Sequence, residues 1–141
     1  MAFGRTVNVQ TRGYSDVHDL TPAVRQAVRE SGIRDGLVAV TSVGSTASVS
    51  TIEYEPALVE DLKELLEKLA PATMHSRHSA TWGDDNGFSH LRATLMGPGV
   101  TLPLVDGEAA LRPRRQGLEA HALGPPRPGP GLQVKGEVHF P

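Results

Sequence analysis

Residues 35–53 read DGLVAVTSVGSTASVSTIE, and this stretch decides the class of the fold. Its two segments, 35–43 and 46–53, are rich in β-branched residues, which is the composition of β-strands. A Gly-Ser pair separates the segments, so we expect the two strands to form a hairpin. The fold is therefore built on a sheet, and the flanking sequence must supply further strands and the helices that cover them.

Upstream of this stretch, the sequence predicts one strand and one helix. Residues 5–13 form the strand, because valines alternate there with polar residues. Residues 19–32 form the helix, with Thr21 as its N-cap, Pro22 at the first helical position and Gly32 at a left-handed stop.

Downstream, residues 56–71 predict a second helix that begins at Pro56. Leucines recur on one side of this helix and charged residues on the other. The leucines are Leu58, Leu62, Leu65, Leu66 and Leu69. We expect this apolar stripe to pack across a sheet.

The remaining sequence predicts strands joined by loops. We expect loops at 78–91 and 124–131, and strands at 90–97, 100–107, 116–123 and 132–140. Two helices among some seven strands indicate a single α+β domain over residues 1–141. Its sheet should be mixed but mainly antiparallel, with the two helices packed on it.

Composition excludes several classes of function. The 14 basic and 16 acidic side chains are nearly balanced, so neither nucleic acid nor an anionic membrane is the expected partner, and any bound anion should be small. The chain has no cysteine, which excludes disulfides, thiolate metal sites and thiol nucleophiles. It also lacks an apolar run of about 20 residues and the apolar core of a signal peptide. We therefore expect a cytoplasmic protein.

The segment HSATWGDDNGFSHL, residues 78–91, holds a candidate metal site. Its two histidines, His78 and His90, could converge on zinc, with Asp84 or Asp85 as a third ligand. The aspartate pair also suits magnesium, which commonly bridges to phosphates. In the alternative interpretation, the histidines hydrogen-bond to the backbone while the aspartates and Asn86 form turns.

Three further features carry candidate polar groups. Ser45 and Thr46 lie in a Gly-Ser-Thr turn that could form a small anion-binding nest. Arg127, between prolines, could bind a phosphate bidentately or be an ordinary solvated side chain. Glu53 could act as a general base or mark the polar end of a strand.

Taken together, several segments of the chain resemble the YjbQ family. They are DLT (19–21), DGLVAVTSVGSTASV (35–49), IEYEPALVEDL (52–62), RHSATWGDDNGFSHLRATLMGPGVTLPLVDG (77–107), RQG (115–117) and GPPR (124–127). The resemblance covers nearly the whole chain, and residues 89–107 are its most specific part.

The resemblance implies a compact α+β domain assembled as a homotrimer, with sites near the subunit boundaries. The family is linked to a secondary thiamine-phosphate synthase activity. That reaction joins a hydroxymethylpyrimidine diphosphate to a thiazole phosphate and releases pyrophosphate. A divalent metal, zinc or magnesium, or cationic side chains would neutralise the leaving diphosphate.

The resemblance also implies roles for individual residues. Glu53, His78 and His90 would be catalytic, and His78, His90 and Asp85 would bind the metal. The substrate-binding residues would be Ser45, Thr46, Asn86, Gln116 and Arg127. The chain departs from the family pattern at several polar motif positions, among them Gly44, where the family has a histidine.

Three functions are compatible with these residues. The first is a YjbQ-like enzyme acting on a small phosphorylated substrate. The second is a non-catalytic trimer that binds a phosphorylated metabolite or anion, which the missing histidine at Gly44 favours. The third is a structural oligomer whose histidines are merely hydrogen-bonded.

Overall fold

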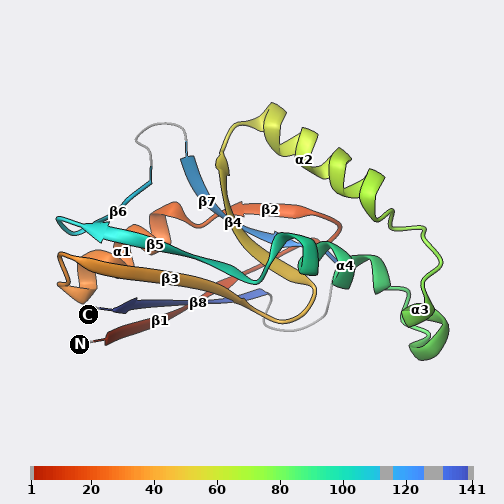
Figure 1. The fold of residues 1–141 in the computed structure, drawn as a ribbon, viewed down its shortest axis with the longest axis horizontal. Helices are drawn as coiled ribbons and strands as arrows, with labels where there is room; N and C mark the ends of the chain where they lie inside the picture. Colours follow the sequence, from red (N-terminus) through yellow and green to blue (C-terminus); the bar gives the residue numbers. More distant parts are fainter. Residues whose placement is uncertain (1, 112–115, 126–131, 140–141) are drawn as a thin grey trace.

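The computed structural model of the chain describes residues 2–111, 116–125 and 132–139, which form two β-sheets and four helices (Figure 1). The five-stranded sheet has the order β1 (Ala2–Val9), β8 (Leu132–His139), β3 (Gly36–Val43), β5 (Gly99–Val105) and β6 (Glu108–Ala109). The three-stranded sheet has the order β2 (Asp16–Asp19), β7 (Gln116–Ala122) and β4 (Ala47–Glu53). All strand pairs in these described residues are antiparallel. The α+β class is confirmed, with the strands divided between two sheets.

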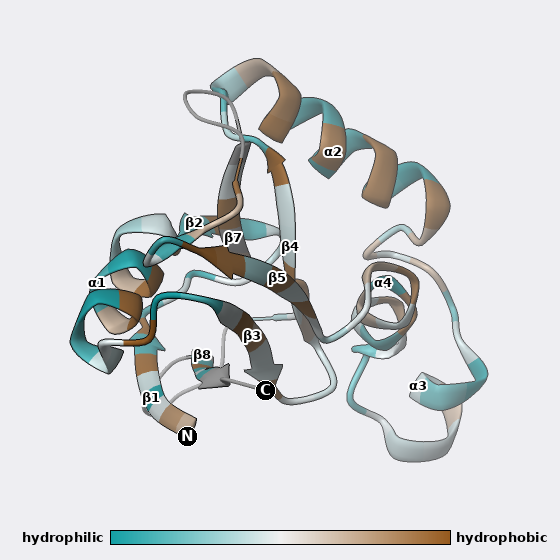
Figure 2. Cartoon of the chain, turned by 60° about the vertical axis from the view of Figure 1, so that its left-hand side comes forward, coloured by the Kyte–Doolittle hydropathy of each residue, from teal (hydrophilic) through white to brown (hydrophobic). Residues whose placement is uncertain are grey.

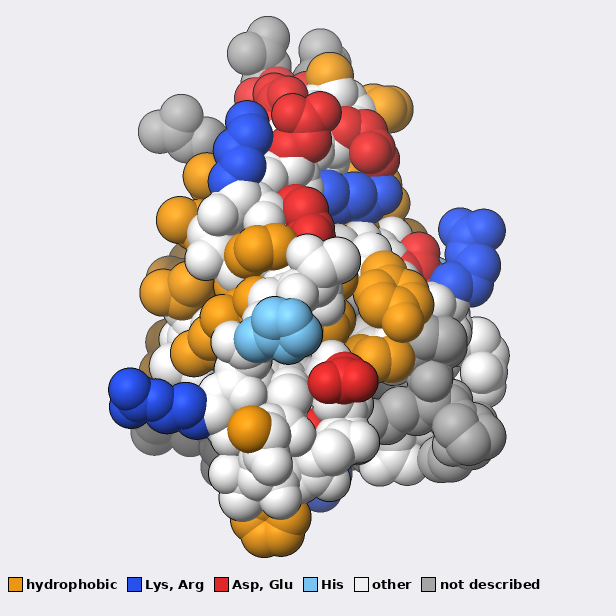
Figure 3. Space-filling view, turned by 90° about the vertical axis from the view of Figure 1, so that its right-hand side faces the viewer, with side chains coloured by type: hydrophobic (Ala, Val, Ile, Leu, Met, Phe, Trp, Pro, Cys, Tyr) orange, Lys and Arg blue, Asp and Glu red, His pale blue; other side chains and the backbone are white. Residues whose placement is uncertain are grey.

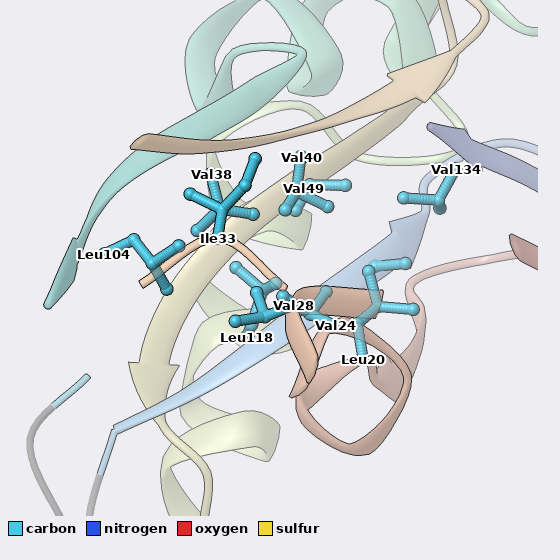
Figure 4. Packing of buried hydrophobic residues seen from close by; sticks show 11 residues of the cluster. Leu20, Val24, Val28, Ile33, Val38, Val40, Val49, Leu104, Leu118 and Val134 are labelled. Atoms are coloured by element: carbon cyan, nitrogen blue, oxygen red, sulfur yellow. The ribbon is translucent and has the colours of Figure 1, made fainter. Parts of the chain in front are cut away.

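The strands predicted on either side of Gly44 are confirmed, but the hairpin is wrong. β3 lies in the five-stranded sheet and β4 in the three-stranded sheet, so the chain crosses between sheets at this turn. Val38 and Val40 of β3 and Val49 of β4 are all buried between the sheets (Figure 4). Packing the two strands face to face buries these valines, whereas a hairpin would have placed both strands in one layer.

Helix α1 (Thr21–Ser31) completes this core. Val24 and Val28 pack into the cluster between the sheets, and Gly32 ends the helix with a φ of 67°, as predicted. The predicted N-cap is wrong, because Thr21 is the first helical residue and its backbone N–H donates to the Asp19 carboxylate. The Thr21 hydroxyl instead accepts a hydrogen bond from the backbone N–H of Leu118, which ties the helix to β7.

Helix α2 (Pro56–Leu69) begins at the predicted proline, but it does not pack across a sheet. Within its leucine stripe Leu66 is buried, while Leu65 is 50% and Leu69 60% exposed. Leu66 packs with Leu123 and Ala93 in a small second cluster. Figures 1 and 2 show α2 standing beside the sheets, with hydrophobic residues along its length.

The loop predicted at 78–91 and the strand predicted at 90–97 are both wrong. Residues Arg77–Trp82 form helix α3 and residues Gly87–Met96 form helix α4. Local chemistry explains both helices. The Ser76 side chain caps α3, and Gly83 ends it in the left-handed region, while Phe88 and Arg92, four residues apart, are buried on one side of α4.

The other predicted elements of the second half are confirmed where the structure describes them. The strands expected at 100–107, 116–123 and 132–140 correspond to β5, β7 and β8. The predicted loop at 124–131 lies mostly outside the described residues. No helix within the described ranges is long and apolar enough to cross a membrane.

Candidate functional site

A glycine allows the two histidine-bearing helices to meet. Gly87 is the first residue of α4, and a Cβ atom there would lie 2.0 Å from Ser76 Oγ and 3.4 Å from His78 Cβ. Only a residue without a side chain permits this close approach. The start of α3 is therefore pressed against the start of α4, which places His78 beside α4.

His78 and His90 lie together at this junction. Their ring centroids are 4.7 Å apart, and the rings are tilted by 58°. The Asp84 carboxylate lies 3.5 Å from His78 Nε2, which is too long for a strong hydrogen bond. His78 Nε2 and Asn86 Oδ1 are both buried without a hydrogen-bond partner. The imidazole nitrogen can therefore still donate or accept a hydrogen bond or bind a metal ion, and the amide oxygen can still accept a hydrogen bond or bind a cation.

A surface cavity of about 240 Å³ adjoins His90. It is lined by Gly44, Ser45, Ala47, His90, Ala93, Thr94 and Pro98. The polar groups of this lining are two hydroxyls and one imidazole, and the lining holds no carboxylate. Figure 3 shows this end of the molecule, with a histidine at the middle of the face, hydrophobic side chains around it and acidic side chains gathered above.

The segment after β7 lies against the turn at residues 44–46 and the start of α4. The backbone N–H of Leu123 donates to the Thr46 carbonyl oxygen at 3.0 Å. A Cβ atom on Gly124 would lie 2.9 Å from Ser89 Oγ and 3.5 Å from Thr46 Cβ. The turn at 44–46, the start of α4 and the end of β7 therefore converge beside the cavity. Arg127 follows Gly124 by three residues but lies outside the described residues.

Two predicted site residues lie elsewhere in the chain. Glu53 pairs in register with Gln116, at the end of β4 that is remote from the cavity. Because β4 runs from Ala47 to Glu53, an extended strand puts about 20 Å between its ends. The side chain of Gln116 is outside the described residues. Within one chain, Glu53 therefore does not join His90.

The predicted metal ligands are brought only partly together. Asp84, rather than Asp85, lies against His78, and Asp85 turns the chain between the helices with a φ of 47°. In the described part of the chain, no three His, Asp or Glu side chains are arranged to hold a metal ion. His78 and His90 thus form a pair of candidate ligands that needs a further ligand from another source.

Sequence reasoning missed the part of the cavity that α4 supplies. His90 and Thr94 are four residues apart, so on a helix both face the cavity, whereas on the strand expected there they would be further apart. Asn86, a residue type that is common at helix N-caps, was the available signal. His121 lies outside the site, in β7, where burial lowers its pKa to about 4.

The fold and the site define an α+β protein with two antiparallel sheets and a histidine pair beside a small surface cavity. The sequence model of the UPF0047 protein YjbQ-like family matches residues 5–117. The chain belongs to this family.

Relatives and solved structures agree with that assignment. A UPF0047 protein of Methanothermobacter thermautotrophicus is 37% identical over 93 residues, covering 66% of this chain and 64% of that protein, which is less than two thirds of its length. A UPF0047 protein of Archaeoglobus fulgidus is 34% identical over 105 residues, covering 74% of this chain and 79% of that protein. A YbjQ-like protein of unknown function from Sulfolobus solfataricus P2 superposes with a TM-score of 0.90 at 26% identity, covering 98% of this chain and 96% of that chain.

Proposed function

We propose that the cavity beside His90 binds a small phosphorylated molecule and that His78 and His90 act there as metal ligands or proton-transfer groups. The observation that carries this proposal is their convergence with Ser45, since Ser45 and His90 line one cavity and the His78 ring lies 4.7 Å from the His90 ring. These residues come from segments far apart in the sequence.

The chemistry of the cavity suits a phosphate group. The Ser45 hydroxyl and an N–H of His90 are hydrogen-bond donors, whereas the Thr94 hydroxyl already donates to the His90 carbonyl oxygen at 2.8 Å. The lining has no carboxylate to repel an anion. The cavity of about 240 Å³ suits a small group rather than a large ligand. Arg127, on the segment that continues from Gly124, would add a positive charge for bidentate binding.

The residues at the junction are also suited to a divalent metal. Imidazole is a common zinc ligand, and two imidazoles lie side by side here. The Nε2 atom of His78 is buried without a hydrogen-bond partner. A bound metal would supply positive charge to a leaving diphosphate. Without it, the ring nitrogens of His78 and His90 are still groups that can hold and transfer a proton.

In this proposal the protein is a homotrimer, and a neighbouring chain contributes Glu53 and Gln116. The length of β4 separates these residues from the cavity of their own chain. An assembled site would therefore contain the two histidines of one chain and the carboxylate of another. Together with the family resemblance, this arrangement favours weak thiamine-phosphate synthase activity or chemistry on another small phosphorylated substrate.

Calorimetric titration with pyrophosphate, in the presence and absence of zinc or magnesium, tests the proposal. We expect wild-type protein to bind, and His90→Ala to bind at least ten times more weakly because it removes a polar wall of the cavity. His75→Ala is the matched control, since it removes an exposed histidine that does not line the cavity. Equal binding by wild type and His90→Ala would refute the site, as would no binding under any of these conditions.

The second candidate function is binding without catalysis, and Gly44 favours it. Gly44 has a φ of 135°, which residues with a side chain rarely adopt, so a histidine in this position would need a different backbone. Incubation with hydroxymethylpyrimidine diphosphate and thiazole phosphate separates the two functions. Formation of thiamine phosphate supports the enzyme, whereas pyrophosphate binding without product supports the binding protein.

A further inference from the structure

A second surface cavity lies on the other side of α4 and has no part in the proposed function. Its volume is about 270 Å³. It is lined by Tyr14 and Ser15 before β2, by Lys63, Glu64 and Glu67 on α2, and by Arg92 on α4. Arg92 is two residues from both His90 and Thr94, which on a helix is a rotation of about 200°. The two cavities are therefore separate.

The guanidinium of Arg92 is a fixed positive charge in the wall of this cavity. Its side chain is 2% exposed, and it donates to the Ala70 carbonyl oxygen, the Ser15 hydroxyl and the Glu67 carboxylate. A guanidinium has five N–H donors, so one on each terminal nitrogen is left without an acceptor in the described part of the chain. A charge held in this way is preorganised to bind a carboxylate.

α2 supplies negative charge to the same cavity. Glu64 and Glu67 are three residues apart, so they lie on one side of the helix. Both carboxylate oxygens of Glu67 are occupied, one by Arg92 and the other by the backbone N–H of Ala72 at 2.9 Å. The exposed Glu64 carboxylate lies 4.0 Å from the Lys68 ammonium, which is too long for a hydrogen bond. Glu64 is therefore the carboxylate that can accept from a bound cation.

The turn that carries Tyr14 and Ser15 has an unusual backbone. Gly13, Tyr14 and Ser15 all have positive φ angles, of 77°, 52° and 65°. Residues with a side chain rarely adopt this region, and such residues cluster at ligand sites. Two backbone hydrogen bonds of 2.8 Å hold the turn, from Tyr14 to the Gly124 carbonyl oxygen and from Ser15 to that of Ala122.

This turn gives the cavity a flat aromatic wall. The Tyr14 ring is stacked on the Phe88 ring, with an interplanar angle of 4° and centroids 6.5 Å apart. Tyr14 is nevertheless 59% exposed, so part of its surface is free to contact a ligand. The neighbouring Ser15 is 4% exposed and places its hydroxyl 3.0 Å from Arg92 Nη1. The aromatic wall and the cationic group therefore come from one strained turn.

We propose that this cavity binds a small zwitterion with the chemistry of an aromatic α-amino acid. The carboxylate binds Arg92, the ammonium group binds Glu64, and the ring packs against Tyr14. Opposite charges in the lining match the opposite charges of the ligand, whereas a simple anion would be repelled by the two glutamates. A volume of about 270 Å³ is that of roughly nine water molecules, which suits a molecule of this size.

Calorimetric titration with three related probes tests the proposal. The free amino acid phenylalanine carries both charges, 3-phenylpropanoate lacks the ammonium group, and 2-phenylethylamine lacks the carboxylate. We expect wild-type protein to bind phenylalanine at least ten times more tightly than either analogue. No saturable binding of phenylalanine would overturn the site, and equally tight binding of an analogue would overturn the zwitterion.

Two variants assign the contacts without disturbing the buried Arg92. Glu64→Gln should weaken phenylalanine binding about tenfold and leave 3-phenylpropanoate unaffected, whereas Tyr14→Ala should weaken all three probes. Asp61→Asn is the matched control, since it neutralises an exposed carboxylate on α2 that does not line the cavity. Wild-type affinity for phenylalanine in both variants would overturn the site. Neither residue lines the cavity beside His90, so pyrophosphate binding should be unchanged and reports on the proposed function separately.

Discussion

The core between the two sheets and the helical end, which consists of α2, α3 and α4, differ in how completely each buries its apolar side chains. In the core, Val40 is 1% and Leu118 0% exposed, whereas Leu69 and Leu95 at the helical end are 60% and 66% exposed. The core is complete within one chain. The helical end carries the histidine pair and the cavity, and its unburied leucines are those expected of a surface that meets another molecule. Stability and the candidate function therefore reside in different regions.

Equivalent truncations in the two regions should differ most. Leu118→Ala leaves a cavity between the sheets and should lower the free energy of unfolding by about 3–5 kcal/mol. Leu95→Ala should change it by no more than about 0.5 kcal/mol in the monomer, because the side chain is largely exposed. Urea unfolding at low protein concentration measures both. Similar losses would abolish the distinction between the regions.

Arg92 ties α4 to the end of α2 and to Ser15, which precedes β2, and its removal should have the next largest effect. This arginine is 2% exposed, and its guanidinium donates to the Ala70 carbonyl oxygen at 2.9 Å, the Ser15 hydroxyl at 3.0 Å and the Glu67 carboxylate. Its guanidinium also lies 4.8 Å from the Phe88 ring centroid.

Arg92→Ala should lower the free energy of unfolding by about 3 kcal/mol, because buried polar groups lose their donor and a cavity remains. The exposed neighbour Leu91 provides the control. If Leu91→Ala destabilised the protein as much as Arg92→Ala, the role of Arg92 as the link would be refuted.

A titratable group in the core makes the stability of the fold sensitive to acid. His121 is fully buried in β7, with its Nε2 3.1 Å from Ser50 Oγ, and burial lowers its pKa from 6.5 to about 4. The unfolded chain therefore takes up the proton first. The stability that depends on neutral His121 is complete above about pH 6.5 and is lost as the pH falls towards 4.

Between pH 7.5 and pH 5, this linkage should reduce the free energy of unfolding by about 2 kcal/mol. His121→Gln should flatten that dependence even if it lowers stability overall. Urea unfolding at several pH values measures the slopes. A wild-type slope retained in His121→Gln would assign the acid sensitivity elsewhere.

The smallest predicted effect is a gain in stability at a defect in the core. Gly136 lines a narrow apolar crevice of about 20 Å³ between α1 and the five-stranded sheet. A Cβ atom there would meet nothing closer than the Arg5 carbonyl oxygen at 3.9 Å. Gly136→Ala should therefore raise the free energy of unfolding by about 0.5–1 kcal/mol, seen as a higher melting temperature. A loss of stability would show that the strand needs glycine here.

The same contrast explains what could be predicted from sequence. In β3, β4 and α1 the apolar pattern follows the period of the element, because one side of each element enters a core made by the same chain. Those elements were predictable. Their division between two sheets was not, because the pattern identifies a buried face but not the layer that covers it.

The helical end resisted prediction because its pattern is inverted. In α4 the charged Arg92 is buried while Leu91 and Leu95 are exposed, so hydrophobicity indicates the wrong side of the helix. The candidate histidines could still be named, because imidazole chemistry depends on residue type. Their pairing depended on the close approach at Gly87, which no periodicity reveals.

Nuclear magnetic resonance of protein labelled at its histidine side chains, titrated with pyrophosphate, tests the central claim most directly. His78 and His90 lie at the candidate site and His121 lies in the core, so each region carries its own probe. We predict that the signals of His78 and His90 shift in a saturable manner while that of His121 does not move. Unchanged His78 and His90 signals, or an equal shift of His121, would contradict the assignment of ligand binding to the helical end.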